Sequence, residues 1–241
     1  MTNVHRMRRM IVICFVLVAV VIAMVGAQES WQSIAPETQA NVPTEATARQ
    51  QLASLVIKGR APKTGYTRTQ FGDGWARTNG CDTRNIILHR DLKNATVSQD
   101  CKVQSGTLTD PYTGKEIVFT RGAGTSAQVQ IDHVVALSDA WQKGAQQLTV
   151  QERTQLANDP LELLAVDGPA NQAKSDGDAA TWLPPNKAFR CQYVARQIAV
   201  KAKYRLWVTQ AEYDAMARVL KGCSAQPLPL AVSKMPVSAL E

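Results

Sequence analysis

The longest run of apolar residues lies near the N-terminus and has no counterpart later in the chain. Residues 10–27 contain no charged side chain, three arginines precede them, and the run ends with Val25, Gly26 and Ala27. A basic start, an apolar stretch and a small-residue end are typical of a secretory signal. We therefore predict that residues 1–27 are a signal peptide. An uncleaved N-terminal anchor is the alternative, because this uncharged stretch just reaches the length that spans a bilayer.

Beyond this run, the hydrophobic pattern divides the chain into one folded region and two flanks. Residues 28–54 are rich in Gln, Thr, Ala and Pro, which is the composition of a flexible linker. Residues 224–241 contain three prolines and no helical period, so we expect a loose C-terminal tail. Residues 55–223 carry regular apolar patterns and are predicted to form a single domain.

Short apolar runs bounded by turn residues predict three strands within this domain. They cover residues 116–120, 127–137 and 161–166. The first of them follows residues 110–114, whose Asp-Pro-Tyr-Thr-Gly sequence is a strong turn signal. The last is bounded by Asp-Pro on one side and Gly-Pro on the other.

Helix-start signals predict four helices, all in the C-terminal half of the domain. A capping box at Thr149 opens a helix that ends near Asn158, and a short helix follows from about Pro169. The other two are a helix capped by Asn186 that runs to about Lys203, and a helix from a capping box at Thr209 to Lys221. The predicted class is α+β, with the helices concentrated towards the C-terminal end.

The cysteines agree with export. Cys14 lies inside the N-terminal apolar run, which leaves Cys81, Cys101, Cys191 and Cys223 in the domain. An even number of cysteines in an exported chain predicts disulfides. Three pairings are open; we favour Cys81–Cys101 and Cys191–Cys223, because each closes a local loop. Zinc is disfavoured, since no CxxC or CxxH spacing is present. We expect a secreted or extracytoplasmic protein.

The distribution of charged residues along the chain is more informative than the net charge. The formal net charge is +7, but residues 28–241 carry 24 basic and 20 acidic side chains. Residues 128–185 hold three basic and eight acidic side chains, whereas 58–93 hold eight basic and three acidic, and 187–221 eight basic and two acidic. An acidic centre suits a cation and basic flanks suit phosphates, which favours a nucleic-acid partner. Solvated helix faces are the alternative explanation.

Histidine is scarce, and this excludes several classes of hydrolase. After residue 27 the chain contains only His89 and His133, so a zinc hydrolase of the HExxH type is impossible. The GxSxG nucleophile elbow is also absent. A cysteine protease needs a free thiol, and all four cysteines of the domain are assigned to disulfides. We expect His89 to be structural.

His133 is the histidine with chemically useful neighbours. Asp132 precedes it in a predicted strand, and Asn171 opens a predicted helix that also carries Lys174. Carboxylate and amide oxygens are hard ligands that suit Mg²⁺, and a neutral imidazole can take a proton from water. Consecutive side chains of an unbent strand point to opposite faces. The order strand, loop, strand and helix can nevertheless bring Asp132, His133 and Asn171 to one point.

The two segments that carry these residues, 131–135 and 171–176, resemble the HNH endonucleases, or ββα-metal nucleases. With residues 80–85 and 182–184 added, the pattern resembles a secreted HNH family related to the C-terminal domain of GmrSD-type restriction enzymes. The resemblance covers about residues 66–223. It implies a ββα-metal core with additional C-terminal helices.

The resemblance also implies roles for single residues. His133 would be the general base that activates water. Asp132 and Asn171 would hold one divalent ion, Mg²⁺ being expected and Mn²⁺ or another ion the alternative. Arg84 would contact the phosphate, with a salt bridge to a neighbouring aspartate as the alternative. Lys174 would contact phosphate or neutralise a nearby aspartate.

One position departs from the family pattern. The middle asparagine of the family, nine residues before the helix ligand, falls on Glu162. That asparagine braces the loop that orients the histidine, and a carboxylate accepts hydrogen bonds but does not donate them. Asn158 is the alternative brace.

These residues predict an exported, metal-dependent HNH endonuclease that hydrolyses DNA with low sequence specificity. The alternative is a secreted nucleic-acid-binding module that keeps the HNH fold without catalysis. A cell-wall hydrolase is a third option, and would need a carboxylate pair such as Asp176 and Asp178. We expect no small-molecule cofactor, and a membrane contact only if the N-terminal segment is uncleaved. Trp75, Trp141 and Trp182 are expected to be buried, with base stacking as the alternative.

Overall fold

The computed structural model of the chain describes residues 46–229. The predicted signal peptide lies outside the described residues, as do most of the predicted linker and the end of the predicted tail. Within the described range, no helix has the length and apolar content that a membrane crossing requires.

Seven α-helices, seven strands and four short 3-10 helices make up the described region. The strands are β1 (Arg77–Thr78), β2 (Cys81–Asp82), β3 (Lys93–Val97), β4 (Val103–Thr109), β5 (Glu116–Thr120), β6 (Val129–His133) and β7 (Leu163–Asp167). The α-helices are α2 (Ala48–Ser54), α3 (Thr83–Asp91), α4 (Leu137–Gln142), α5 (Val150–Ala157), α6 (Gly168–Lys174), α7 (Arg190–Lys203) and α8 (Gln210–Lys221). The 3-10 helices are η1 (Arg68–Phe71), η2 (Ser126–Gln128), η3 (Ala145–Gln147) and η4 (Lys187–Phe189).

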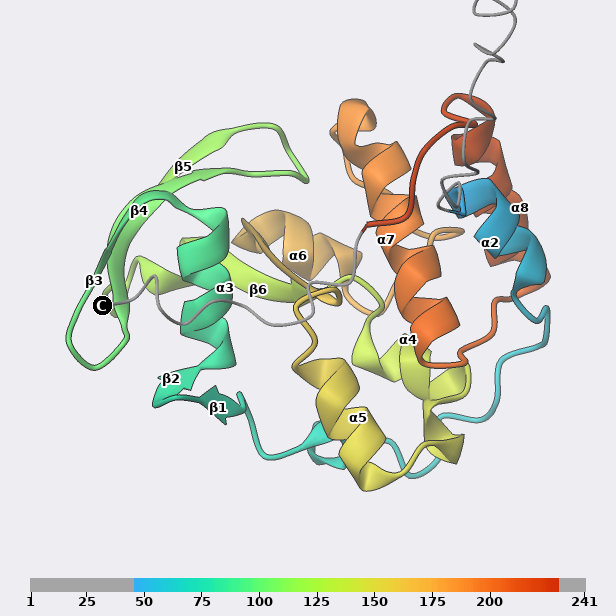
Figure 1. Ribbon diagram of the computed structural model, residues 1–241, viewed down its shortest axis with the longest axis horizontal. Helices are drawn as coiled ribbons and strands as arrows, with labels where there is room; N and C mark the ends of the chain where they lie inside the picture. The colour runs from blue at the N-terminus through green and yellow to red at the C-terminus, as the bar shows by residue number, and fades with distance from the viewer. Residues whose placement is uncertain (1–45, 230–241) are drawn as a thin grey trace, which may run out of the picture. The chain divides into compact units, whose positions relative to one another are not determined.

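The strands form three small antiparallel sheets. Strands β1 and β2 pair with each other, β3, β4 and β5 form a meander, and β6 pairs with β7. In the last sheet Val129 lies opposite Asp167 and His133 lies opposite Leu163. Figure 1 shows the meander and α3 on one side of β6, and α2, α7 and α8 together on the other.

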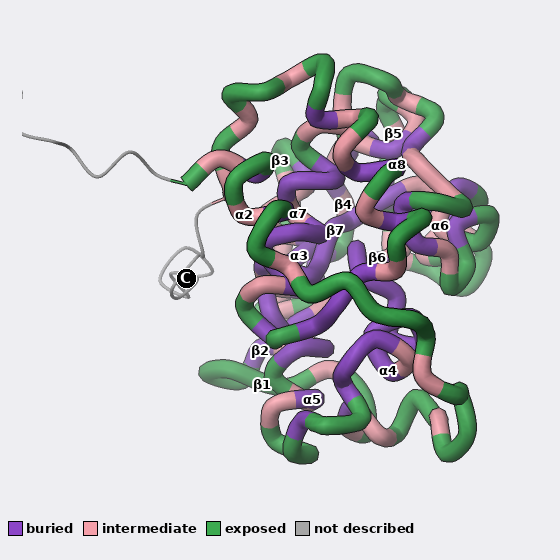
Figure 2. The backbone as a smooth tube through the Cα atoms, turned by 90° about the vertical axis from the view of Figure 1, so that its right-hand side faces the viewer, coloured by how far each residue is buried: buried purple, intermediate pink, exposed green. Residues whose placement is uncertain are grey.

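The β6–β7 sheet separates two apolar cores. Its residues Val129, Ile131, Leu163 and Ala165 pack with α3 and the meander. Leu164 and Val166 of β7, together with the turn after β6, pack into the larger core that α2, α4, α5, α7 and α8 enclose. Because side chains alternate along a strand, a sheet in this position is buried on both faces. Figure 2 shows both strands running through the buried interior, in contrast to the exposed β1.

Strand β7 leads directly into α6. The side chain of Asp167 accepts a hydrogen bond from the backbone N–H of Ala170, and Pro169 occupies the first turn of the helix. A Cβ atom on Gly168 would collide with the carbonyl oxygen of Ala127, so only glycine allows the helix to lie this close to the start of β6. The order β6, β7, α6 is thus strand, strand, helix, as the sequence predicts.

Several predicted elements are confirmed, and one strand is shorter than expected. Strand β5 has the predicted bounds, and α5 begins with a complete capping box. The strand predicted for 127–137 ends at His133 instead, because the chain turns there and α4 begins at Leu137. Helices α3 and α4 were not predicted; neither opens with a complete capping box.

The predicted boundaries of the domain, residues 55 and 223, are both wrong. Helix α2 lies within the expected linker, and it buries Ala48 and Leu52 against α7 and α8. Thr47 pairs with Pro227, which lies in the expected tail. Composition marked both segments as loose, whereas a few apolar side chains with long-range contacts are enough to order them.

Both favoured disulfides are present. Cys81 is bonded to Cys101, with a sequence separation of 20 residues, and Cys191 is bonded to Cys223, with a separation of 32. The first joins β2 to the loop before β4, and the second joins the start of α7 to the end of α8. Each therefore closes a local loop, as expected from the spacing of the cysteines.

Candidate active site

A tight turn positions the first residue of the site. The carboxylate of Asp110 accepts hydrogen bonds from the backbone N–H groups of Thr113 and Asp167, and so ties the 110–114 turn to the end of β7. This places Tyr112 in the core, where it is fully buried. Its hydroxyl donates a short hydrogen bond to Oδ2 of Asp132. The sequence predicts this turn, but no pattern in it indicates the role of the tyrosine.

Asp132 is held from a second side by Lys174. The ammonium nitrogen of Lys174 lies 2.9 Å from Oδ1 of Asp132 and 2.8 Å from the backbone oxygen of His133. Both side chains are buried. Burial raises the pKa of Asp132, while Lys174 and Tyr112 act in the opposite direction. Lys174 is therefore used inside the protein, and its predicted contact with phosphate has no support from this geometry.

Asn171 lies on the same side of β6 as Asp132. Its amide nitrogen donates to Oε1 of Gln130 at 2.9 Å, and Gln130 is two residues before Asp132 on the strand. Residues two apart share a face of a strand, so α6 presents both Asn171 and Lys174 to the face that carries Asp132. Within residues 46–229, no hydrogen-bond donor reaches the amide oxygen of Asn171.

This donor set fits a hard divalent ion. The described residues contain no group of three His, Cys, Asp or Glu side chains that would hold a metal. Mg²⁺ commonly needs only one or two protein ligands, because water and substrate phosphates complete its coordination. Asp132 retains a second lone pair on each oxygen, and the oxygen of Asn171 is unused.

His133 leaves the strand in the opposite direction. Its Nε2 lies 2.9 Å from the backbone oxygen of Ala157. A carbonyl oxygen only accepts, so Nε2 carries the proton and Nδ1 keeps a lone pair. The ring stacks on Trp75, with centroids 5.7 Å apart and planes 3° from parallel. Burial lowers the pKa of His133 to about 3, and Arg68 and Lys174 act in the same direction.

A hollow of about 360 Å³ opens beside this histidine. It is lined by Arg68, Thr69, Phe71, Gly72, Asp73, Gly74, Trp75, His133, Leu137 and Ala157. Gly72 and Gly74 have φ values of 101° and 127°, which other residues rarely adopt, so the glycines let this loop place Trp75 over His133. Sequence analysis counted Arg68 only as part of the basic flank, because no motif marks it.

Glu162 braces the turn that follows His133. Its backbone oxygen accepts the N–H of Val134 at 2.9 Å, and both carboxyl oxygens lie 3.2 Å from the N–H of Val135. Gln197 donates to the backbone oxygen of Val134 at 2.8 Å. Burial raises the pKa of Glu162 well above its ordinary value, which favours the neutral form of its carboxyl group. The residue at the family's asparagine position thus lies where the brace is expected.

Asn158, the alternative brace, is used elsewhere. Its side-chain oxygen accepts the backbone N–H of Ala76 at 2.8 Å, and its nitrogen donates to the backbone oxygen of Thr154. It therefore ties the end of α5 to the segment before β1.

Arg84 also has an internal role. Its guanidinium lies 3.3 Å from the backbone oxygen of Val129 and 3.5 Å from that of Ser126. Burial lowers its pKa, and nearby Arg121 adds to the effect. Asp82, the expected salt-bridge partner, instead caps α3 through Asn85. The predicted contact between Arg84 and phosphate therefore has no support from this arrangement.

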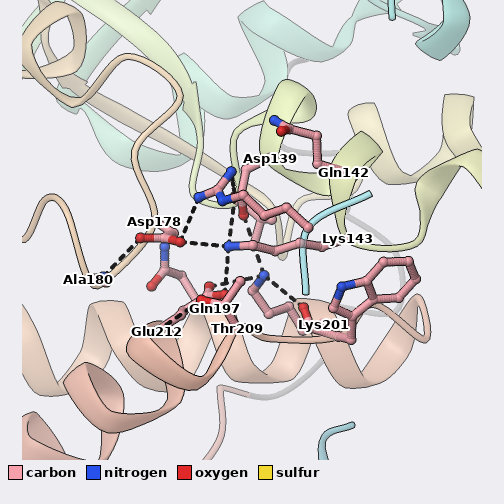
Figure 3. A network of polar contacts seen from close by, with 12 residues as sticks. Asp139, Gln142, Lys143, Asp178, Ala180, Gln197, Lys201, Thr209 and Glu212 are labelled. Atoms are coloured by element: carbon pink, nitrogen blue, oxygen red, sulfur yellow. Dashed lines mark hydrogen bonds and ion pairs between the residues drawn. The ribbon is translucent and has the colours of Figure 1, made fainter. Parts of the chain in front are cut away.

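The acidic pair proposed for cell-wall hydrolysis is engaged in two separate sets of ion pairs. Asp176 contacts Lys63 at 3.2 Å. Asp178 contacts Arg60 and Lys143 at 2.7 Å each. Asp178 belongs to a buried group of charges that we call the lysine network (Figure 3). Its members are Arg60, Asp139, Lys143, Asp178, Lys201 and Glu212.

The three tryptophans differ in their surroundings. Trp141 is buried in the larger core beside Tyr66 and Phe71, and Trp182 is partly buried against Tyr112. Trp141 agrees with the expectation of burial, whereas Trp182 meets it only in part. Trp75 is only partly buried and borders the hollow beside His133.

Comparison with known proteins places these residues in a family context. Residues 81–219 match the family model described as GmrSD restriction endonucleases, C-terminal domain. An uncharacterized secreted protein of Arthroderma benhamiae is 38% identical over 189 residues, which cover 77% of this chain and 89% of the relative. No solved structure matches. With this secreted relative and two disulfides, the chain is a secreted protein.

Proposed function

The chain belongs to the family of the GmrSD restriction endonuclease C-terminal domain, and from this premise we propose that it is an exported endonuclease of the HNH type. In this proposal it hydrolyses the phosphodiester bonds of DNA in a metal-dependent reaction with low sequence specificity. The family indicates a nuclease that acts on nucleic acid. The type of centre, the metal and the preference for DNA are the finer parts of the proposal.

The observation that carries the proposal is the state of His133. The carbonyl of Ala157 holds the proton on Nε2, so Nδ1 is a proton acceptor beside a hollow that water and substrate can enter. Burial lowers its pKa to about 3, so the imidazole is neutral at physiological pH and Nδ1 is unprotonated. A general base of this kind removes a proton from the attacking water.

Asp132 and Asn171 are the residues that would hold the divalent ion. When bound, such an ion stabilises the charge that develops on the phosphate during hydrolysis. Tyr112 and Lys174 fix the carboxylate of Asp132 in one orientation. Asp132 and His133 are consecutive residues at the end of β6, and their side chains leave the strand in opposite directions.

The remaining residues of the site keep His133 in place. Lys174 holds the backbone oxygen of His133, and Glu162 holds the next two N–H groups. A base that is fixed to a fraction of an ångström delivers its lone pair to one water position, which is where orientation contributes to the rate. Glu162 is therefore a positioning residue in this proposal.

Low sequence specificity follows from the proposed mode of binding. Lysine and arginine side chains in residues 58–93 and 187–221 would contact phosphates. Phosphate contacts fix the position of the backbone but carry no direct sequence information. Binding should therefore weaken steeply with salt and vary little among DNA sequences.

The direct experiment is cleavage of supercoiled plasmid by the purified chain with Mg²⁺ or Mn²⁺, and again after addition of a chelator. We expect nicked and then linear DNA with metal and no conversion with the chelator. Full activity in the chelator would contradict the metal-dependent mechanism. A parallel reaction with RNA of similar length tests the preference for DNA.

A binding module without catalysis is the second candidate, and one observation favours it. Both oxygens of Asp132 already accept hydrogen bonds, so an incoming ion must share them with Lys174 and Tyr112. In that case the chain would bind DNA without metal and cleave nothing with any of several divalent ions. Electrophoretic mobility shifts run beside the plasmid assay distinguish the two candidates.

A further inference from the structure

The hollow beside His133 contains groups that proton transfer alone does not require. Trp75 and Phe71 provide aromatic surface, and Arg68 provides a guanidinium. Trp75 covers the imidazole of His133 with one face of its ring and still borders the open space. A water-filled access channel to a general base needs neither aromatic walls nor a cation.

The size of the hollow restricts what can enter. Its volume of about 360 Å³ is at the lower end of the range for small-molecule sites in proteins. A double helix is far wider than such a space, whereas a single nucleotide is of a suitable size. Residues of η1, the loop 72–75 and Ala157 at the end of α5 border this space. A nucleotide that occupies it would therefore belong to a nucleic-acid strand that is flexible enough to turn one base inwards.

The charges of the lining suit a nucleotide. Arg68 is exposed, and none of the described acidic side chains forms a salt bridge with it. Guanidinium groups bind phosphate oxygens through paired hydrogen bonds. Asp73 is the one carboxylate of the lining, and its oxygens are acceptors for the amino group of a base. The hollow thus offers a phosphate contact, a stacking surface and a polar rim beside the proposed base.

We infer that this hollow is a subsite for one unpaired nucleotide next to the cleaved bond, with its base against Trp75 and its phosphate on Arg68. The inference rests on the proposed function, because it takes nucleic acid as the substrate. It narrows that substrate to single strands or unpaired segments. Stacking on an aromatic ring accepts any base, so the subsite is consistent with low sequence specificity.

Binding measurements without cleavage test the subsite. The purified chain is titrated in chelator with a fluorescently labelled single-stranded 12-nucleotide DNA and with a duplex of the same sequence. A base in a duplex must first leave its stack, which disfavours entry, so we expect the single strand to bind at least about tenfold more tightly. Gels run afterwards show that the DNA is intact.

Variants then assign the preference to the hollow. Trp75→Ala should weaken single-strand binding by about tenfold, whereas Trp75→Phe keeps an aromatic surface and should bind nearly as the parent does. Arg68→Ala should weaken single-strand binding by about fivefold to tenfold and reduce its salt dependence by one phosphate contact. Duplex binding should change little in each variant. Arg49→Ala on α2 is the matched control, since it removes one exposed arginine far from the lining in sequence.

Two results would overturn the subsite. Equal affinity for single strand and duplex is one, and unchanged single-strand affinity in both Trp75→Ala and Arg68→Ala is the other. Arg68 is exposed, so its removal leaves the core intact and keeps the test valid if Trp75→Ala fails to fold. Selective binding without cleavage in any divalent ion would support the subsite and contradict the proposed hydrolysis. Cleavage together with equal binding of single strand and duplex would support the proposed hydrolysis and contradict the subsite.

Discussion

Two polar clusters, one around Lys143 and one at the end of β6, treat charge in opposite ways. One is the lysine network, in which Lys143 contacts Asp139, Asp178 and Glu212, each at 2.7 Å (Figure 3). The other, which we call the β6 cluster, consists of Tyr112, Asp132, His133, Glu162 and Lys174. Apart from Arg60, whose side chain is exposed, the members of both clusters are almost completely removed from solvent.

In the lysine network, oppositely charged partners favour the charged forms of Lys201 and Asp178. Burial alone would lower the pKa of Lys201, but Glu212 and Asp139 raise it. Burial alone would raise the pKa of Asp178, but Lys143 and Arg60 lower it. Three carboxylates face three cations, and each ion has an opposite charge at contact distance.

In the β6 cluster, burial has a larger effect on the pKa values than the neighbouring charges have. The pKa values of Asp132 and Glu162 are raised and that of His133 is lowered, so every shift favours the neutral form. The cluster has two carboxyl groups and one ammonium, which contacts Asp132 but not Glu162, and among the described residues the imidazole has no anionic partner in contact. A structural ion cluster needs an opposite charge in contact with each buried charge. Catalytic sites often bury ionisable groups without such partners, and this shifts their pKa values. In the proposed function, the lysine network contributes stability and the β6 cluster carries the chemistry.

The largest expected effect is on activity in the β6 cluster. Replacing His133 with alanine removes the proposed base and should slow plasmid cleavage by about 10²- to 10⁴-fold. His89→Ala is the matched control and should cleave at the parent rate. Initial rates of nicking at saturating metal measure the effect. Full activity of His133→Ala would break the assignment of chemistry to this cluster.

The counterpart in the lysine network is a loss of stability. Lys143→Met leaves buried carboxylates without their central cation, and should lower the free energy of unfolding by about 3–5 kcal/mol. Urea denaturation monitored by circular dichroism measures it. At a temperature where the variant is folded, its cleavage rate per folded molecule should equal that of the parent. A stable but inactive variant would show that the network takes part in the chemistry.

His133 and Glu162 in the β6 cluster should make opposite contributions to the pH dependence of the free energy of unfolding. The lowered pKa of His133 contributes stability above pH 6.5 that is lost as the pH falls towards about 3. The raised pKa of Glu162 contributes stability below about pH 4.5 that is lost as the pH rises towards its folded value. These slopes have opposite signs between pH 5 and 6.5, and each reaches at most about 1.4 kcal/mol per pH unit.

Replacing one of the two residues at a time reveals the contribution of the other to the pH dependence of stability. In His133→Ala the stability should fall more steeply as the pH rises from 5 to 6.5 than it does in the parent. In Glu162→Gln it should rise more steeply over the same range. Urea midpoints at three pH values in this window are sufficient. Parallel profiles for the parent and both variants would mean that neither group is held neutral by burial.

The smallest effect concerns the brace. A carboxyl group and an amide have nearly the same shape, so Glu162→Gln should change the catalytic constant by less than about threefold. Glu162→Asn shortens the side chain and forfeits its hydrogen bond to Val135, worth about 1 kcal/mol, or roughly a fivefold loss. Steady-state cleavage of a fluorogenic oligonucleotide compares the two. A faster Glu162→Asn variant would show that glutamate is a defect at this position.

What the sequence could predict was local. The capping box at Thr149, the strand at Glu116–Thr120 and the two disulfides depend on short spacings, and all are present. The pairing of Asp132 with Tyr112 and Lys174 could not be predicted, because these residues are 20 and 42 positions away and no pattern records which buried groups will meet. Arg68 was missed for the same reason. Its position beside His133 depends on how η1 packs against α5.

The central claim is that the β6–β7–α6 unit forms a hydrolytic centre in which Asp132 and Asn171 hold a metal ion beside His133. The most direct test is a crystal structure of the chain grown with Mn²⁺ and a phosphorothioate oligonucleotide. The account predicts an anomalous peak for one ion in contact with an oxygen of Asp132 and the amide oxygen of Asn171, with a phosphate near Nδ1 of His133. An ion bound elsewhere, or no ion in crystals whose protein cleaves DNA in the same buffer, would contradict it.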